Sequence, residues 1–122
     1  MSLEEKISTY IEKFEDDVPD VISTSVVKYD GFELFNSNNI KVNSKKYAAM
    51  SAGLHGISNR TLNALKGGDL VQTYIKGTDV EIIIMSIPDK KLFVSATTKK
   101  DPNIGLIIYQ MEQLVKELKE VL

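Results

Sequence analysis

The sequence predicts a single α+β domain whose elements follow the order helix, two strands, helix, three strands, helix. Three observations support this prediction. Asp30 and Gly31 supply turn chemistry between two strand-like runs, as in a β-hairpin. Residues 80–87 are apolar on both faces, which is typical of a strand inside a covered sheet. Residues 47–59 are helix-like and rich in Ala and Gly, and they contain no charged side chain unless His55 is protonated.

The first helix and the hairpin occupy the N-terminal third of the chain. Ser2 and Glu5 match a capping box at the start of the helix, and Pro19 follows its end. Residues 21–29 are rich in β-branched side chains, and residues 32–36 alternate between apolar and polar, so we predict that they pair as two strands. The apolar face of the first helix carries Leu3, Ile7, Tyr10, Ile11 and Phe14.

The second helix is predicted to run from about Ser44 to Lys66 and to end at Gly67 and Gly68. Small side chains cover the part of this helix that is not expected to face the core, and small side chains let a second backbone approach closely. We therefore predict that this helix meets its own copy in a dimer. At about 100° per residue, the larger side chains share one face that we expect to pack on the protein's own core: Tyr47, Met50, Leu54, Ile57, Thr61 and Leu65.

Three further strands are predicted at residues 70–76, 80–87 and 92–98, close enough in sequence to form a meander. The strand at 70–76 is the more polar, which favours a position at an edge of the sheet. The last helix begins near Asn103 and carries a broad apolar stripe. The width of this stripe favours packing across the sheet over a coiled coil.

The composition is that of one globular domain spanning residues 1–122. The chain is 43% hydrophobic and 26% charged, with a net charge of −2. A chain of this length buries roughly two thirds of its unfolded surface, which is enough for a core without disulfides or a structural metal. Cysteine is absent, so thiol catalysis, thiolate metal sites and disulfides are excluded.

The charge and hydropathy patterns also limit the partners and the location. The slight acidity and the lack of a basic stripe argue against nucleic-acid binding. The longest apolar run, residues 82–85, is too short to span a bilayer, and the chain opens on charged residues and not on an apolar signal segment. We therefore expect a cytoplasmic protein without direct membrane insertion.

With these elements in this order, the chain resembles the Roadblock / dynein light-chain domain family along nearly its whole length. The matching features are the hairpin turn Asp30-Gly31, the Ala- and Gly-rich second helix, and two short motifs. Gly68-Asp69-Leu70 leads into the third strand, where the family often has Gly-Glu-Leu, and Asn103-Ile104-Gly105 opens the last helix. Lys45 and Lys46 depart from the family pattern, which leaves the charge preference of the partner open.

The resemblance implies a Roadblock/profilin-like sandwich with a five-stranded antiparallel sheet of order 2-1-5-4-3. The first and last helices would cover one face and the second helix the other. Dimers would form through the second helix and the edge third strand. Prokaryotic members are regarded as regulators or partners of small Ras-like GTPases. Eukaryotic relatives serve as dynein light chains or as scaffold subunits that hold GTPases at membranes.

Two sets of site residues follow from these expectations. The predicted dimer interface comprises small residues of the second helix and two positions of the third strand: Ala48, Ala49, Ser51, Ala52, Gly53, Gly56, Val71 and Thr73. The predicted partner-binding residues are polar groups on the flanks of the same helix: His55, Asn59, Arg60 and Asn63.

Arg60 is the only arginine of the chain. An arginine delivered to a bound GTPase stabilises charge that develops during phosphoryl transfer, so Arg60 is a candidate for that role. Its place in the last turns of a helix favours a structural cation instead. We expect a rim contact and not a catalytic finger.

Catalytic motifs are missing from the sequence. No Gly-x-x-x-x-Gly-Lys-Ser/Thr run is present, so the chain is not expected to be a GTPase itself. His55 is the sole histidine and has no carboxylate near it in sequence, so we predict no catalytic residue, no metal site and no cofactor. The favoured function is a non-catalytic homodimer that binds and regulates a small Ras-like GTPase. The alternatives are a scaffold or dynein-light-chain-like subunit without GTPase regulation, and an uncharacterised enzyme or small-ligand binder.

Overall fold

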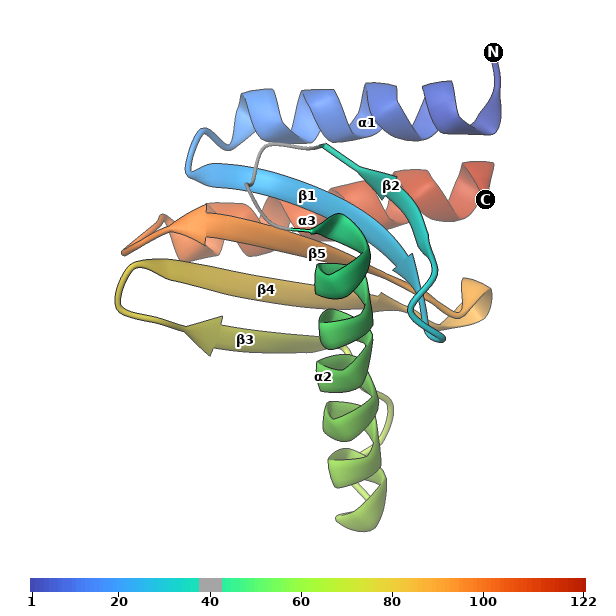
Figure 1. Cartoon of the computed structure of the whole chain (residues 1–122), viewed down its shortest axis with the longest axis vertical. Helices are drawn as coiled ribbons and strands as arrows, with labels where there is room; N and C mark the ends of the chain where they lie inside the picture. The colour runs from blue at the N-terminus through green and yellow to red at the C-terminus, as the bar shows by residue number, and fades with distance from the viewer. Residues whose placement is uncertain (38–42) are drawn as a thin grey trace.

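The computed structural model describes residues 1–37 and 43–122. Over these ranges it forms three α-helices, a short 3-10 helix and one sheet of five strands (Figure 1). The elements are α1 (Leu3–Asp17), β1 (Val21–Lys28), β2 (Glu33–Asn36), α2 (Ser44–Ala64), β3 (Gln72–Lys76), β4 (Val80–Ile87), the 3-10 helix η1 (Pro88–Lys90), β5 (Leu92–Lys99) and α3 (Ile104–Val121).

The sheet has the order β2-β1-β5-β4-β3, and every pair of neighbouring strands is antiparallel. The expected strand order is therefore confirmed, and β3 lies at an edge as its polar composition predicted. In Figure 1, α2 crosses in front of the strands while α3 lies behind them, and α1 runs alongside α3. The expected arrangement of two helices on one face and one on the other is confirmed.

The larger core lies between the sheet and the pair α1 and α3. Ile7 and Ile11 of α1 meet Met111 and Leu118 of α3 in one cluster of buried apolar side chains. Each such side chain contributes about 1.5–3 kcal/mol when it leaves water, so this layer supplies most of the stability. The smaller core, under α2, has Val27, Ala48, Ile84 and Phe93 as its buried members.

Local polar contacts define the ends of the helices on this face. The predicted capping box of α1 is present, with Ser2 Oγ accepting from Glu5 N at 3.1 Å. Asn103 caps α3 through its side chain, and its backbone N–H donates to Asp20 Oδ2 at 2.8 Å. This backbone hydrogen bond, followed by the contact with Lys99, lowers the pKa of Asp20. The start of α3 is thus attached to the start of β1.

The orientation of α2 differs from the expectation. The larger side chains that were predicted to face the core are mostly exposed: Met50 at 60%, Leu54 at 39%, Ile57 at 57%, Leu65 at 75%, and also Thr61. Tyr47 alone of that set reaches the sheet, where its hydroxyl bonds to Ser95 Oγ at 2.6 Å. The prediction is wrong because α2 has two stripes of residues at helical spacing, and periodicity alone does not say which stripe faces the sheet. The stripe with the smaller side chains is the one that lets α2 lie close to the sheet.

Candidate interface on helix α2 and strand β3

The face of α2 that meets the sheet is built from Ala48, Ser51 and His55. Ala48 and Ser51 are each 1% exposed, so both are covered within the single chain. Ser51 Oγ donates back to Tyr47 O at 2.9 Å, which satisfies the buried hydroxyl without a partner from the sheet. The prediction that Ala48 and Ser51 face a second copy is therefore wrong, because both already face the protein's own sheet.

Small side chains also accommodate the hairpin turn between β1 and β2. Gly31 lies at this turn with φ +96°, a backbone conformation that favours glycine. A Cβ at Gly31 would lie 3.5 Å from Ala49 Cα and 3.8 Å from Ala52 Cβ. Ala49 and Ala52 thus let the turn approach α2, and the Ala-rich composition has an explanation inside one chain.

His55 lies between α2 and the middle of the sheet. Its Nε2 is 2.6 Å from Ser86 Oγ, and its ring stacks on Phe93 with centroids 5.0 Å apart. Tyr29 covers the other side at a centroid distance of 4.4 Å. Burial lowers the pKa of His55, so the imidazole is neutral near neutral pH. The expectation that His55 is an exposed partner-binding group is wrong, since the side chain is 3% exposed.

The pair of His55 and Ser86 does not make a catalytic site. Both residues lie under α2, and Ser86 is only 7% exposed, so the pair is not presented to a substrate. In the parts of the chain that the structure describes, no three His, Asp or Glu residues are grouped to hold a metal ion. None of the described helices has the length and apolar character that a membrane span requires.

The outward side of α2 has two flanks of different chemistry. We call Met50, Leu54 and Ile57 the apolar flank; they share one side of the helix at about 100° per residue. The apolar flank is on the β3 side, because Ser58, next in sequence to Ile57, accepts a hydrogen bond from Thr73 Oγ1 at 3.0 Å. Periodicity did place these three residues on one face, but that face was assigned to the core because periodicity alone does not distinguish a core stripe from an exposed one.

The opposite side of α2 carries small and polar residues, which we call the polar flank: Ala49, Gly56, Arg60 and Asn63. Arg60 and Asn63 are exposed, as expected, whereas Asn59 is half-buried. The Arg60 side chain folds back along the helix, with Nη1 4.0 Å from the position that a Cβ on Gly56 would take. Gly53 is exposed between the two flanks.

Strand β3 is the open edge beside the apolar flank. Of the two predicted interface positions here, Val71 is 66% exposed just before the strand and Thr73 is half-buried within it. Figure 1 shows that the C-terminal part of α2 extends beyond β3, past the last strand of the sheet. The edge strand and the projecting helix therefore form one continuous uncovered region.

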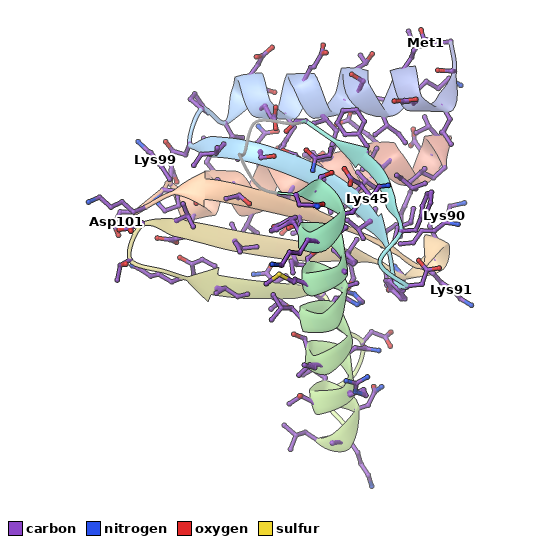
Figure 2. The ribbon with its side chains drawn as sticks, in the orientation of Figure 1. Met1, Lys45, Lys90, Lys91, Lys99 and Asp101 are labelled. Atoms are coloured by element: carbon purple, nitrogen blue, oxygen red, sulfur yellow. The ribbon has the colours of Figure 1, made fainter. Side chains whose placement is uncertain are left out.

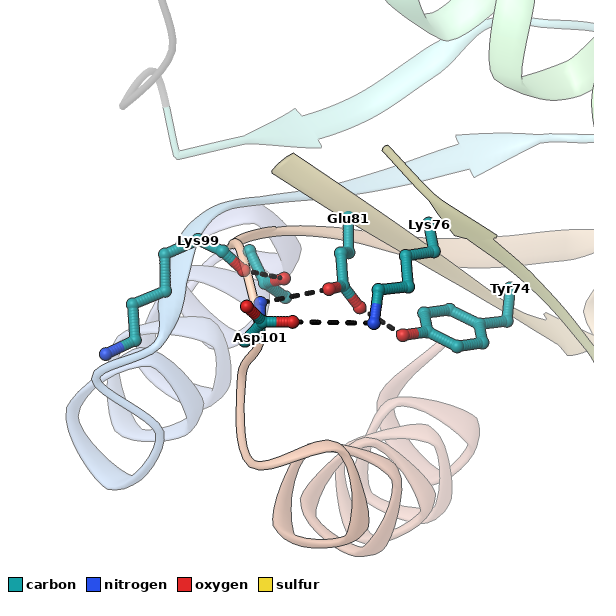
Figure 3. Close-up of polar contacts among 6 residues, drawn as sticks. Tyr74, Lys76, Glu81, Lys99 and Asp101 are labelled. Carbon is teal, nitrogen blue, oxygen red and sulfur yellow. Dashed lines mark hydrogen bonds and ion pairs between the residues drawn. The ribbon is translucent and has the colours of Figure 1, made fainter. Parts of the chain in front are cut away.

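A polar cluster holds the far end of β3 in place (Figure 3). Glu81 of β4 is 1% exposed; its carboxylate accepts from the Tyr74 hydroxyl and from Asp101 N, the latter at 3.0 Å. Lys76 Nζ pairs with Asp101 Oδ1 at 3.4 Å. The hydrogen bond to Glu81, with burial second, raises the pKa of Tyr74. The cluster connects β3 to the loop before α3, so this edge is held in a defined position.

Comparisons with known proteins agree with this architecture. The family model described as Roadblock/LC7 domain matches residues 11–96. No curated protein sequence matches the chain. Among solved structures, Myxococcus xanthus MglB superposes with a TM-score of 0.87 at 11% identity, covering 95% of this chain and 94% of that one.

Two further structures show the same likeness. A Roadblock/LC7 domain from Streptomyces avermitilis gives a TM-score of 0.81 at 16% identity, covering 98% of this chain and 97% of its own. The gliding protein MglB from Thermus thermophilus gives 0.85 at 10% identity, covering 99% and 91%. At these identities the three structures show a shared fold.

Proposed function

Because the chain belongs to the Roadblock/LC7 domain family, we propose that it is a homodimeric, non-catalytic module that binds and regulates a small Ras-like GTPase. The observation that carries this proposal is the apolar flank of α2 beside the open edge of β3. Both features are the kind of surface that a folded monomer ordinarily covers.

A second copy is the occupant that fits both features at once. Related by a two-fold axis beside β3, two copies place their β3 strands antiparallel and let the sheet continue from one copy into the other. The same axis brings the two apolar flanks together and sets the projecting end of each α2 over the partner's sheet. Met50, Leu54 and Ile57 are 60%, 39% and 57% exposed, so covering what remains exposed contributes about half of the roughly 1.5–3 kcal/mol that full burial of each side chain would give.

The polar flank is the proposed surface for the GTPase. Arg60 and Asn63 stay exposed on the side of α2 away from the apolar flank, so a dimer made through the apolar flank leaves them available. A few hydrogen-bond donors around small side chains suit the rim of a protein interface. His55 does not belong to this surface because it lies inside the chain.

The proposal is tested by capture from a lysate of the source cell on the immobilised chain, with GDP in one arm and a non-hydrolysable GTP analogue in the other. We expect a Ras-like GTPase that is retained with one nucleotide and lost with the other. The double variant Arg60→Ala with Asn63→Ala is expected to reduce the amount retained. Lys13→Ala with Lys116→Ala, on α1 and α3, is the matched control and is expected to retain the wild-type amount.

Other outcomes favour the alternatives. Retention of structural proteins that does not depend on the nucleotide favours a scaffold or dynein-light-chain-like subunit. Retention of a metabolite without a protein favours a small-ligand binder. A GTPase that binds the wild type and the polar-flank variant equally means that the polar flank is the wrong surface.

A further inference from the structure

Two turns lie side by side at one end of the sheet, because β1 and β5 are neighbours. Tyr29 N donates to Lys91 O at 3.0 Å, which joins the turn after β1 to the turn before β5. Lys45, near the start of α2, lies on the other side of the first turn, where it shares a hollow with Phe32. We call the exposed cations of this end the lysine surface: Lys28, Lys45, Lys90 and Lys91. Figure 2 shows Lys45, Lys90 and Lys91 on the same side of the molecule, opposite Lys99 and Asp101.

The lysine surface is positive although the whole chain carries a net charge of −2. In the described ranges the ion pairs involve Lys76, Lys99 and Lys119, and none of the four lysines of this surface takes part. The carboxylates near the turns are Asp30, Glu33, Asp69 and Asp89. Asp69 acts electrostatically on Tyr29, and Asp89 already pairs with Lys119 at 3.2 Å. Four lysines against Asp30, Glu33 and Asp69 leave an excess of one positive charge.

An exposed aromatic side chain and two hollows accompany these charges. Phe32 is 63% exposed, and Lys28 Nζ lies 5.7 Å from the centre of its ring. A hollow of about 330 Å³ is lined by residues of both turns, Tyr29 among them. A second hollow, of about 500 Å³, lies between Phe32 and Lys45. Both hollows are large enough to hold a side chain of a partner.

We propose that the lysine surface binds an acidic segment of another protein that carries at least one apolar side chain. Carboxylates of the segment pair with the lysines, and the apolar side chain packs on Phe32. A flat anionic membrane fits less well, since it would bring its headgroups against Asp30 and Glu33 as closely as against the lysines. A flexible segment can place its carboxylates beside the lysines and avoid both acids. Apart from Lys45 at the start of α2, this surface lies outside α2 and β3 and shares no residue with the apolar or the polar flank, so the inference does not depend on the proposed GTPase function.

The test uses the full chain and two dye-labelled peptides, followed by fluorescence anisotropy. One is a twelve-residue peptide of Glu and Asp with a central Leu, and the other replaces every Glu and Asp by Gln and Asn. We expect saturable binding of the acidic peptide only, weakening by about tenfold between about 50 and 300 mM salt. The triple variant Lys28→Glu, Lys90→Glu, Lys91→Glu is expected to weaken binding by at least about tenfold, and Phe32→Ala by about threefold.

The control variant reverses three exposed lysines elsewhere, Lys13→Glu, Lys100→Glu and Lys116→Glu, and matches the triple variant in net charge. Equal weakening by the control means that only overall charge matters, and the inference is then wrong. It is also wrong if the acidic peptide does not bind saturably, or if the wild type binds phosphatidylserine vesicles and not the peptide. Should the triple variant fail to fold by circular dichroism, Lys90→Glu and Phe32→Ala decide the question, because both positions are exposed.

Discussion

His55 attaches α2 to the sheet through an uncharged ring, and this predicts a pH dependence. Burial depresses its pKa below the ordinary value of 6.5, so the unfolded state binds the proton more readily than the folded state. The stabilisation is present in full above pH 6.5 and is lost as the pH falls through the lowered pKa. We expect the free energy of unfolding from urea titrations to decrease between about pH 7.5 and 5.5. Because His55 is the only histidine, most of this slope should disappear in His55→Gln.

Replacing Tyr74 tests how much the polar cluster at the end of β3 contributes to stability. Tyr74→Phe removes the donor to a carboxylate that is 1% exposed, and an acceptor left without its partner in such a place is unfavourable. We expect the melting temperature to fall by roughly 2–5 °C, a size typical for one lost buried interaction in a domain of this length. Tyr109→Phe is the matched control, because Tyr109 is 57% exposed on α3. Equal melting temperatures for the two variants would mean that the hydrogen bond to Glu81 contributes nothing.

At the scale of the element, periodicity and turn chemistry predicted most of the fold. The bounds of β4 agree residue for residue with the strand predicted at 80–87, and the cap at Ser2 is where the sequence placed it. Which side of α2 packs on the sheet could not be predicted, because residues 48, 51 and 55 are spaced along one side of a helix just as residues 50, 54 and 57 are. Which stripe faces the sheet depends on the close approach of the helix, and this is a tertiary property. For the same reason the buried position of His55 had no signal in its neighbours.

The apolar flank of α2 predicts how dimerisation responds to charge. Leu54→Glu and Ile57→Glu each place two carboxylates, one from each copy, near the proposed two-fold axis, where they lose water and repel one another. Both side chains are exposed in the single chain, so the fold should be retained. We expect the dissociation constant of the dimer to rise by at least about tenfold in sedimentation equilibrium, which corresponds to about 1.4 kcal/mol.

Asn63→Glu on the polar flank is the control for this experiment, because it adds the same charge to the same helix on the other side. It should remain a dimer. If Leu54→Glu and Ile57→Glu are folded and dimerise like the wild type, the apolar flank is not the interface, and the second copy must be sought elsewhere.

At the scale of the whole molecule, the fold separates three surfaces that have different chemistry. The apolar flank of α2 lies beside the open edge of β3, the polar flank of α2 carries Arg60 and Asn63, and the lysine surface lies at the end of the sheet. In the proposed dimer, the two apolar flanks are covered and the two polar flanks, one from each copy, stay exposed. The two-fold symmetric dimer can therefore offer its GTPase a site that contains residues of both copies.

Replacing Arg60 distinguishes between two ways in which the proposed dimer would act on a GTPase. An arginine that reaches the nucleotide stabilises charge only in the transition state, so Arg60→Ala would leave affinity nearly intact and lower stimulated hydrolysis by about 10³-fold or more. An arginine at the rim contributes to ground-state binding, so affinity and stimulation would fall together by less than about tenfold. We expect the second result, because the Arg60 side chain lies back along α2, with Nη1 4.0 Å from the position that a Cβ on Gly56 would take. The measurement is the affinity and single-turnover hydrolysis rate of the captured GTPase with wild type and with Arg60→Ala. A large loss of rate at unchanged affinity would contradict the rim assignment and make Arg60 a catalytic residue acting on the GTPase.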